Sequence, residues 1–242
     1  MVAQQYGEHY VKMRKLLIVG GCSWSNINFK SELHPELDTS WPKWHELLAD
    51  MLDLELVSLG INGAGQEYIF NSLVEYITEL DNKDRIGLVM PAWSRSPRRD
   101  YQIYDKWRNN RFDACGDAYY MVKRSLRYFY QFQIFCERFN LPYKQIHMLD
   151  STRIKDFETP DSYDHGKISH TKIDHTIQSL PFYNKINEEK FLGAPLIRAF
   201  GGYALDQHVI GVSKKKYRIS DVDFHPNKIG NKLLASYIYE NL

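Results

Sequence analysis

The chain has 242 residues, 43% of them hydrophobic and 25% charged, which is enough to bury a sizeable core. Its formal net charge of +1 gives no global reason to expect nucleic acid or an anionic membrane as the main partner. Three cysteines without a Cys-x-x-Cys spacing form no disulfide framework, and no apolar run approaches the roughly 20 residues of a membrane span. With a polar N-terminus that lacks a signal-peptide core, these features predict a cytoplasmic protein.

Hydrophobic patterning predicts strands that alternate with helices along the chain. Short apolar runs predict buried strands at 15–20, 54–59, 86–90 and 143–149. Apolar residues at helical spacing predict amphipathic helices at 41–52, 68–80, 119–139 and 226–242. Asp38, Thr39 and Ser40 are candidate caps of the first helix. This alternation is typical of a parallel sheet covered on both faces.

The predicted fold is therefore a single α/β domain over residues 1–242. We expect a three-layer α/β/α sandwich with a mostly parallel sheet of about five strands, similar to the flavodoxin-like arrangement. Residues 150–221 show no clear period and are expected to pass over the top of the sheet as an irregular excursion. Because such sheets bind ligands at the carboxyl ends of their strands, the loops after the first three strands are where chemistry is expected.

The segment GGCSWS, residues 20–25, follows the first strand directly. Its glycines would hold Ser23 at the carboxyl edge of the sheet, where a hydroxyl can act as a nucleophile if a base activates it. Alone, such a serine is more often a turn or helix-cap residue than a nucleophile.

The segment DVDFHPNKIG, beginning at Asp221, precedes the last helix. His225 lies just before the helix, with Asp223 and Asp221 upstream as candidate orienting carboxylates. A strand-end serine and an acid–histidine pair are complementary parts of a catalytic triad, and this complementarity favours a functional interpretation of both.

These two segments resemble the first and last blocks of the SGNH/GDSL hydrolase superfamily, in a Gly-Cys-Ser variant associated with phage and bacterial members. The resemblance implies the α/β/α fold, Ser23 as nucleophile, His225 as base and Asp223 as its orienting acid. The segment VSLGINGAGQEYI resembles the second block, which implies that Gly63 donates an N–H to the oxyanion hole, with Gly60 and Gly65 as alternatives.

Two departures from this family pattern concern the oxyanion hole and the acid. The Gly-x-Asn-Asp block is absent, and its asparagine would fall near Trp93 or Ser94. Ser94 could donate a hydroxyl instead, or Arg95 could compensate. The usual acid position is Val222, so Asp223 is the better substitute and Asp221 the fallback. Cys22 occupies the place of the family's aspartate and is a rival nucleophile.

Other patterns are weaker. His165, His170 and His175 recur every five residues, a spacing that shares neither a helix face nor a strand face, so no metal site is expected. Basic and aromatic residues alternate over 95–111, a pattern that suits single-stranded nucleic acid, a solvated surface or an anionic substrate beside the cleft. A solvated surface is the commonest origin of such a pattern. Between the two functional interpretations, substrate contact is favoured over nucleic acid, with Trp24 and Arg95 as candidate substrate-binding residues.

The sequence thus predicts a serine esterase that removes acyl groups from a carbohydrate or another small ester, without a metal or organic cofactor. Two alternatives stay open. One is a catalytically weak or inactive domain of the same fold that binds a glycan or a protein. The other is an acyltransferase that uses the same serine and histidine but excludes water.

Overall fold

A three-stranded parallel sheet lies at the centre of the computed structural model, which describes residues 13–110, 117–152 and 170–242. Its strands are β1 (Leu16–Gly20), β2 (Glu55–Ser58) and β3 (Ile86–Pro91), in the order β2-β1-β3. All of β1 is buried, because it has a neighbour on each side and helices above and below. The predicted α/β class and the first three strands are confirmed.

A second parallel pair continues beside β3. β6 (Gln145–Ile146) pairs with β7 (Phe191–Leu192), and single bridges join Val89 to Tyr143 and Ala92 to Ile146. The strand predicted at 143–149 is this short because the N–H of Met148 turns back to the carbonyl of Ile146. The expectation of about five strands in one sheet is therefore met only in part: three form the sheet, and two form the adjoining pair.

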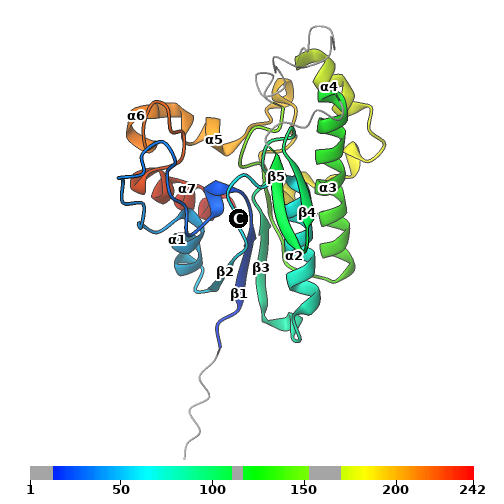
Figure 1. Cartoon of the computed structure of the whole chain (residues 1–242). Helices are drawn as coiled ribbons and strands as arrows, with labels where there is room; N and C mark the ends of the chain where they lie inside the picture. Colours follow the sequence, from blue (N-terminus) through cyan, green and yellow to red (C-terminus); the bar gives the residue numbers. More distant parts are fainter. Residues whose placement is uncertain (1–12, 111–116, 153–169) are drawn as a thin grey trace, which may run out of the picture.

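Helices cover both faces of the sheet (Figure 1). α1 (Trp44–Met51) and α7 (Lys228–Glu240) pack together on one side, and α2 (Gln66–Glu79) and α3 (Ala118–Arg138) lie on the other. The Trp44 N–H donates to Asn231 Oδ1 at 2.9 Å and ties α1 to α7. None of the described helices is both long enough and apolar enough to cross a membrane.

The start of α1 differs from the sequence prediction. Its N-cap is Lys43, whose N–H donates to the side chain of Glu46 at 2.7 Å. The expectation that Asp38, Thr39 or Ser40 caps α1 is wrong, because these residues bond elsewhere: Asp38 accepts from the Ser40 N–H and Thr39 donates to the Phe29 carbonyl.

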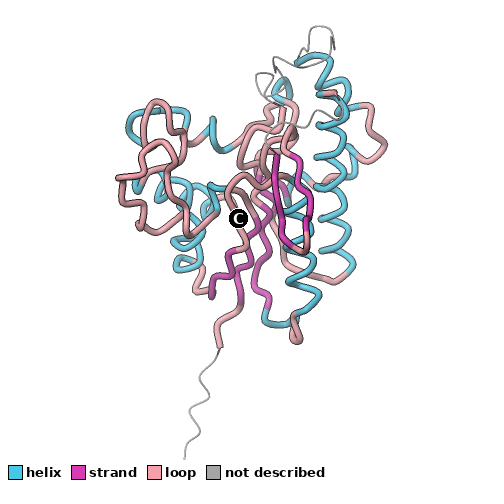
Figure 2. Tube along the Cα trace, in the orientation of Figure 1, coloured by secondary structure: helices cyan, strands magenta, loops and turns pink. Residues whose placement is uncertain are grey.

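An antiparallel hairpin after β3 was not predicted. It consists of β4 (Arg99–Ile103) and β5 (Lys106–Asn110), drawn in magenta in front of the helices in Figure 2. Its two-residue turn has φ of 48° at Tyr104 and 60° at Asp105, the backbone of the primed turns that match strand twist. Such turns usually contain Asn or Gly, and Tyr-Asp gives no comparable signal in the sequence.

The stretch 150–221 contains more regular structure than its sequence indicates, although residues 153–169 lie outside the described ranges. It includes β7 and the helices α4 (His170–Gln178), α5 (Leu205–His208) and α6 (Lys214–Tyr217). Only Ile173 and Ile177 of α4 are buried apolar residues, which is too short a stripe for a clear helical period.

Candidate active site

Ser23 lies in the turn that follows the central strand. β1 ends at Gly20, and a short 3-10 helix, η1 (Ser23–Ser25), begins three residues later, closed by the Ser25 N–H to the Cys22 carbonyl at 2.8 Å. This turn sends neighbouring side chains in different directions. The thiol of Cys22 is fully buried in the hydrophobic core, whereas Ser23 lines a cavity. The geometry therefore favours Ser23 over Cys22 as nucleophile.

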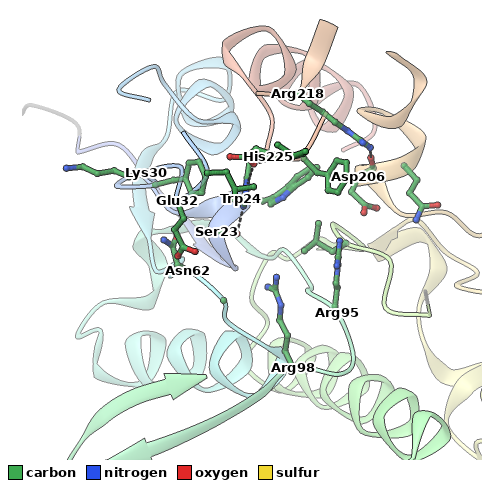
Figure 3. Close-up of a pocket in the computed structure, with 18 of the residues that line it drawn as sticks. Ser23, Trp24, Lys30, Glu32, Asn62, Arg95, Arg98, Asp206, Arg218 and His225 are labelled. Carbon is green, nitrogen blue, oxygen red and sulfur yellow. Dashed lines mark hydrogen bonds and ion pairs between the residues drawn. The ribbon is translucent and has the colours of Figure 1, made fainter. Parts of the chain in front are cut away.

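His225 meets Ser23 from the other end of the chain. The distance from Ser23 Oγ to His225 Nε2 is 2.8 Å, and the distance from Nδ1 to Asp223 Oδ1 is 2.6 Å (Figure 3). The imidazole packs against Phe29 with ring centroids 4.2 Å apart, which fixes its plane. Asp221, the fallback acid, is exposed, and the carboxylate in contact with the ring is that of Asp223.

The position of His225 depends on the start of α7. Asn227 is the N-cap, and its Oδ1 accepts from the N–H groups of Ile229 and Gly230, each at 3.0 Å. Its Nδ2 donates to the carbonyls of Lys216 and Arg218. These hydrogen bonds fix the backbone just before α7, so that the side chain of His225 points toward the end of β1.

Asp223 is a buried carboxylate with both oxygens engaged. Its Oδ1 accepts from the ring and the backbone N–H of His225, and its Oδ2 accepts from the Ser31 hydroxyl at 2.5 Å. Burial raises the pKa of this carboxyl, but the hydrogen bonds from His225 and Ser31 outweigh it and hold the pKa at about 2. Asp223 is therefore ionised at neutral pH, as an acid that orients an imidazole must be.

Ser31 is a site residue that the sequence does not indicate. It lies in the polar loop before α1, 192 residues ahead of Asp223, and its Oγ also accepts from the His34 N–H. His34 Nε2 lies 2.8 Å from Ser220 Oγ, and the same oxygen accepts from the Asp223 N–H. The loop is thus fastened to the turn that carries the acid.

Gly63 lies at the edge of the same cavity, in the loop after β2. Its φ of +77° favours glycine, and a Cβ there would come within 2.5 Å of Asn109 Oδ1. Among the described residues, neither the Gly63 N–H nor the Ser23 N–H has a hydrogen-bond acceptor. The N–H of Gly65, by contrast, donates to Asp100 at 2.8 Å, which leaves Gly63 better placed than Gly65 for an oxyanion.

Ser94 is not in a position to replace the missing asparagine. It is fully buried, its N–H donates to Gln66, and its hydroxyl accepts from Arg98 Nη1 at 2.6 Å. Trp93 is also fully buried, with its indole N–H on Gln145. The two residues after β3 that were expected near the place of the family's asparagine thus face the core rather than the cavity.

The cavity around Ser23 has a volume of about 680 Å³. Trp24 and Arg95, the candidate substrate-binding residues, both line it. Its wall also contains the amide of Asn62, whose Oδ1 accepts from Asn26 Nδ2 at 3.0 Å. Within the described ranges no cluster of His, Cys, Asp and Glu has the arrangement of a metal site; His165 lies outside these ranges.

Comparison with known proteins gives similarity only at the level of solved structures. No family model matches the chain, and no curated protein matches it significantly. A structure described as a lipolytic protein of the G-D-S-L family from Desulfitobacterium hafniense matches 94% of this chain and 99% of its own, at 13% identity and a TM-score of 0.47. A G-D-S-L family lipolytic protein from Veillonella parvula matches 93% and 97%, at 12% identity and 0.46. A protein from Lactobacillus plantarum matches 94% and 96%, at 15% identity and 0.47. At this distance neither activity nor substrate carries over to the chain.

Proposed function

We propose that the protein is a serine hydrolase of the SGNH/GDSL type that cleaves carboxylic esters by acyl transfer. The observation that carries this proposal is the continuous chain of contacts from Ser23 Oγ to His225 Nε2 and from Nδ1 to Asp223, at 2.8 and 2.6 Å. Both distances lie within the reach of a nucleophile–base and a base–acid hydrogen bond.

The proposed reaction has two halves. His225 Nε2 takes the hydroxyl proton as Ser23 Oγ attacks the ester carbonyl, and the resulting tetrahedral intermediate expels the alcohol, which receives that proton from His225. Water then gives a proton to His225 and attacks the acyl-serine carbonyl. The second tetrahedral intermediate releases the acid as the bond to Ser23 Oγ breaks, and His225 returns its proton to that oxygen. Throughout, the ionised Asp223 holds the Nδ1–H tautomer and stabilises the charged imidazolium.

The oxyanion is proposed to bind at the backbone N–H groups of Ser23 and Gly63. Asn62 directly precedes Gly63 and lines the same cavity, and its side-chain amide is our candidate for the third donor. Removing one such donor costs about 10²–10³ in rate in a well-studied protease, so the number of donors decides whether hydrolysis is fast or slow.

A fluorophosphonate probe tests this proposal directly. Wild type should be labelled on Ser23, and Ser23→Ala and His225→Gln should lose the label. Ser25→Ala is the matched control, because the Ser25 hydroxyl is buried two residues further on and has no hydrogen-bond partner among the described residues. A folded wild type that takes no label, or labels equally in Ser23→Ala, would refute the proposal and favour a binding domain. Product analysis with added sugar alcohols then separates hydrolysis from acyl transfer.

A further inference from the structure

We infer that the substrate of this site carries an anionic group, a carboxylate or a phosphate, which binds to arginines on the wall that the β3–β4 loop contributes to the cavity. This inference rests on the proposed function, since it names the substrate class of the same site. It is carried by the charges around the cavity and by the way that Arg98 is held.

The charged side chains that line the cavity carry a net charge of +1 when His225 is neutral. They comprise four cations, Lys30, Arg95, Arg98 and Arg218, and three carboxylates, Glu32, Asp206 and Asp223. Asp223 is already engaged by His225 and Ser31. In a recess with low-dielectric walls an excess of one charge sign raises the local concentration of ligands of the opposite sign.

Arg98 is fixed by one of its nitrogens, and the described residues offer the rest of its guanidinium no acceptor. Its Nη1 donates to the Ala64 carbonyl at 3.0 Å and to Ser94 Oγ at 2.6 Å. Its Nε and Nη2 bond to no other residue within the described part of the chain. An arginine held this way loses little entropy when it binds a carboxylate or phosphate, whose paired oxygens match its fork.

Arg95 and Arg98 extend from the β3–β4 loop toward the side of the cavity that carries Ser23, Trp24 and His225 (Figure 3). Both are half-buried, three residues apart in the chain. Arg218 approaches from the opposite side, with its Cζ 4.9 Å from the Phe224 ring centroid. An ester bound at Ser23 therefore has guanidinium groups beside it, and an anionic substituent on that ester would meet them.

Binding of small anions tests the inference independently of catalysis. Wild type is titrated by calorimetry with benzoate, with phenyl phosphate and with neutral benzamide, at constant ionic strength. Since hydrogen bonds between charged groups are stronger than those between neutral ones, we expect the preferred anion to bind at least about tenfold more tightly than benzamide. Comparing the two anions decides between carboxylate and phosphate. Benzamide binding as tightly as both anions would overturn the inference.

Three variants locate the anion. Arg95→Gln and Arg98→Gln should each weaken anion binding about tenfold or more and leave benzamide unchanged. In Arg98→Gln, glutamine keeps an N–H donor for the Ala64 carbonyl and the Ser94 hydroxyl. Arg99→Gln is the matched control, because Arg99 is exposed and lines a different hollow beside α3. Equal losses of affinity in all three variants would mean that the anion responds to the general charge of the surface or binds in the other hollow, and would overturn the inference. Unfolding curves of each variant confirm that it is folded.

Hydrolysis of a matched ester pair shows whether the anion belongs to the substrate. 4-Acetoxybenzoate should be cleaved with a higher kcat/KM than 4-acetoxybenzamide, and Arg95→Gln should abolish that ratio. Equal rate losses for both esters would place the arginine at the oxyanion and overturn the substrate assignment. Absence of fluorophosphonate labelling together with selective anion binding would instead refute the hydrolase and leave the anion site standing.

Discussion

Replacing Ser31 by alanine removes the hydroxyl that holds the outer oxygen of Asp223. The bond is 2.5 Å long, and the two residues are 4% and 3% exposed, so water has little access to replace it. Holding the pKa of Asp223 at about 2 rather than its usual 3.8 corresponds to about 2.5 kcal/mol in favour of the ionised form. Three hydrogen bonds to Asp223, from the His225 ring, the Ser31 hydroxyl and a backbone N–H, together produce this stabilisation and outweigh the cost of burial. We assign on the order of 1 kcal/mol of it to Ser31.

The expected result is a free energy of unfolding lower by about 1 kcal/mol at pH 7, measured by urea denaturation. The pKa of Asp223 is depressed in the folded protein, so its stabilisation is fully present above about pH 4 and is lost as the pH falls toward 2. The difference between wild type and Ser31→Ala should therefore shrink as the pH is lowered through this range.

Activity provides the second readout, because Asp223 acts through the orientation of His225. We expect kcat/KM to fall about fivefold to tenfold, in line with about 1 kcal/mol of lost transition-state stabilisation. Ser31→Cys keeps nearly the same volume but has only a weak donor, so it should behave like alanine. Wild-type activity in Ser31→Cys would show that only packing matters at this position, and an unchanged kcat/KM in Ser31→Ala would refute the positioning role.

Two further predictions concern the oxyanion loop and a buried histidine. Gly63→Ala would introduce a Cβ 2.5 Å from Asn109 Oδ1, at a φ of +77° that costs residues other than glycine about 1–2 kcal/mol. We therefore expect kcat to fall at least tenfold. A second substitution, Asn109→Gly, should restore kcat only in part, because it removes the clash and not the backbone strain. Full recovery in the double variant would mean that the clash alone matters. Burial lowers the pKa of His45 to about 3. Below about pH 6.5 the imidazole therefore takes up a proton when the protein unfolds. As a result, the free energy of unfolding should fall by about 1.4 kcal/mol per pH unit from pH 6 to 4. His45→Asn should flatten this slope in urea titrations, and an unaltered slope would show that other groups cause it.

Local sequence signals were sufficient to predict the strand that precedes Ser23 and the helix that follows His225. The apolar run of β1 and the glycines after it predict a strand that delivers Ser23 to the edge of the sheet, and the periodic stripe of α7 predicts a helix just after His225. These signals lie within a few residues of each other, because the hydrogen bonds of a helix and the side-chain period of a strand or a helix are local. The same reasoning failed at α1, which is capped by Lys43 although usual capping residues lie just upstream, and at the β4–β5 hairpin, whose turn lacks Asn and Gly.

Contacts between distant segments decided the rest of the site. From the sequence, Asp221 and Asp223 were both candidates for the acid, and the structure brings Asp223 to the imidazole while Ser31 approaches from a loop 192 residues away. Ser94 and Arg98 lie in one loop, yet packing buries the first and leaves the second lining the cavity. Side-chain direction in loops depends on which segments pack against them, and that choice is made by the whole core. The sequence by itself therefore determined the strand-end serine and the histidine before the last helix, whereas the tertiary structure decided which acid, donors and arginines surround them.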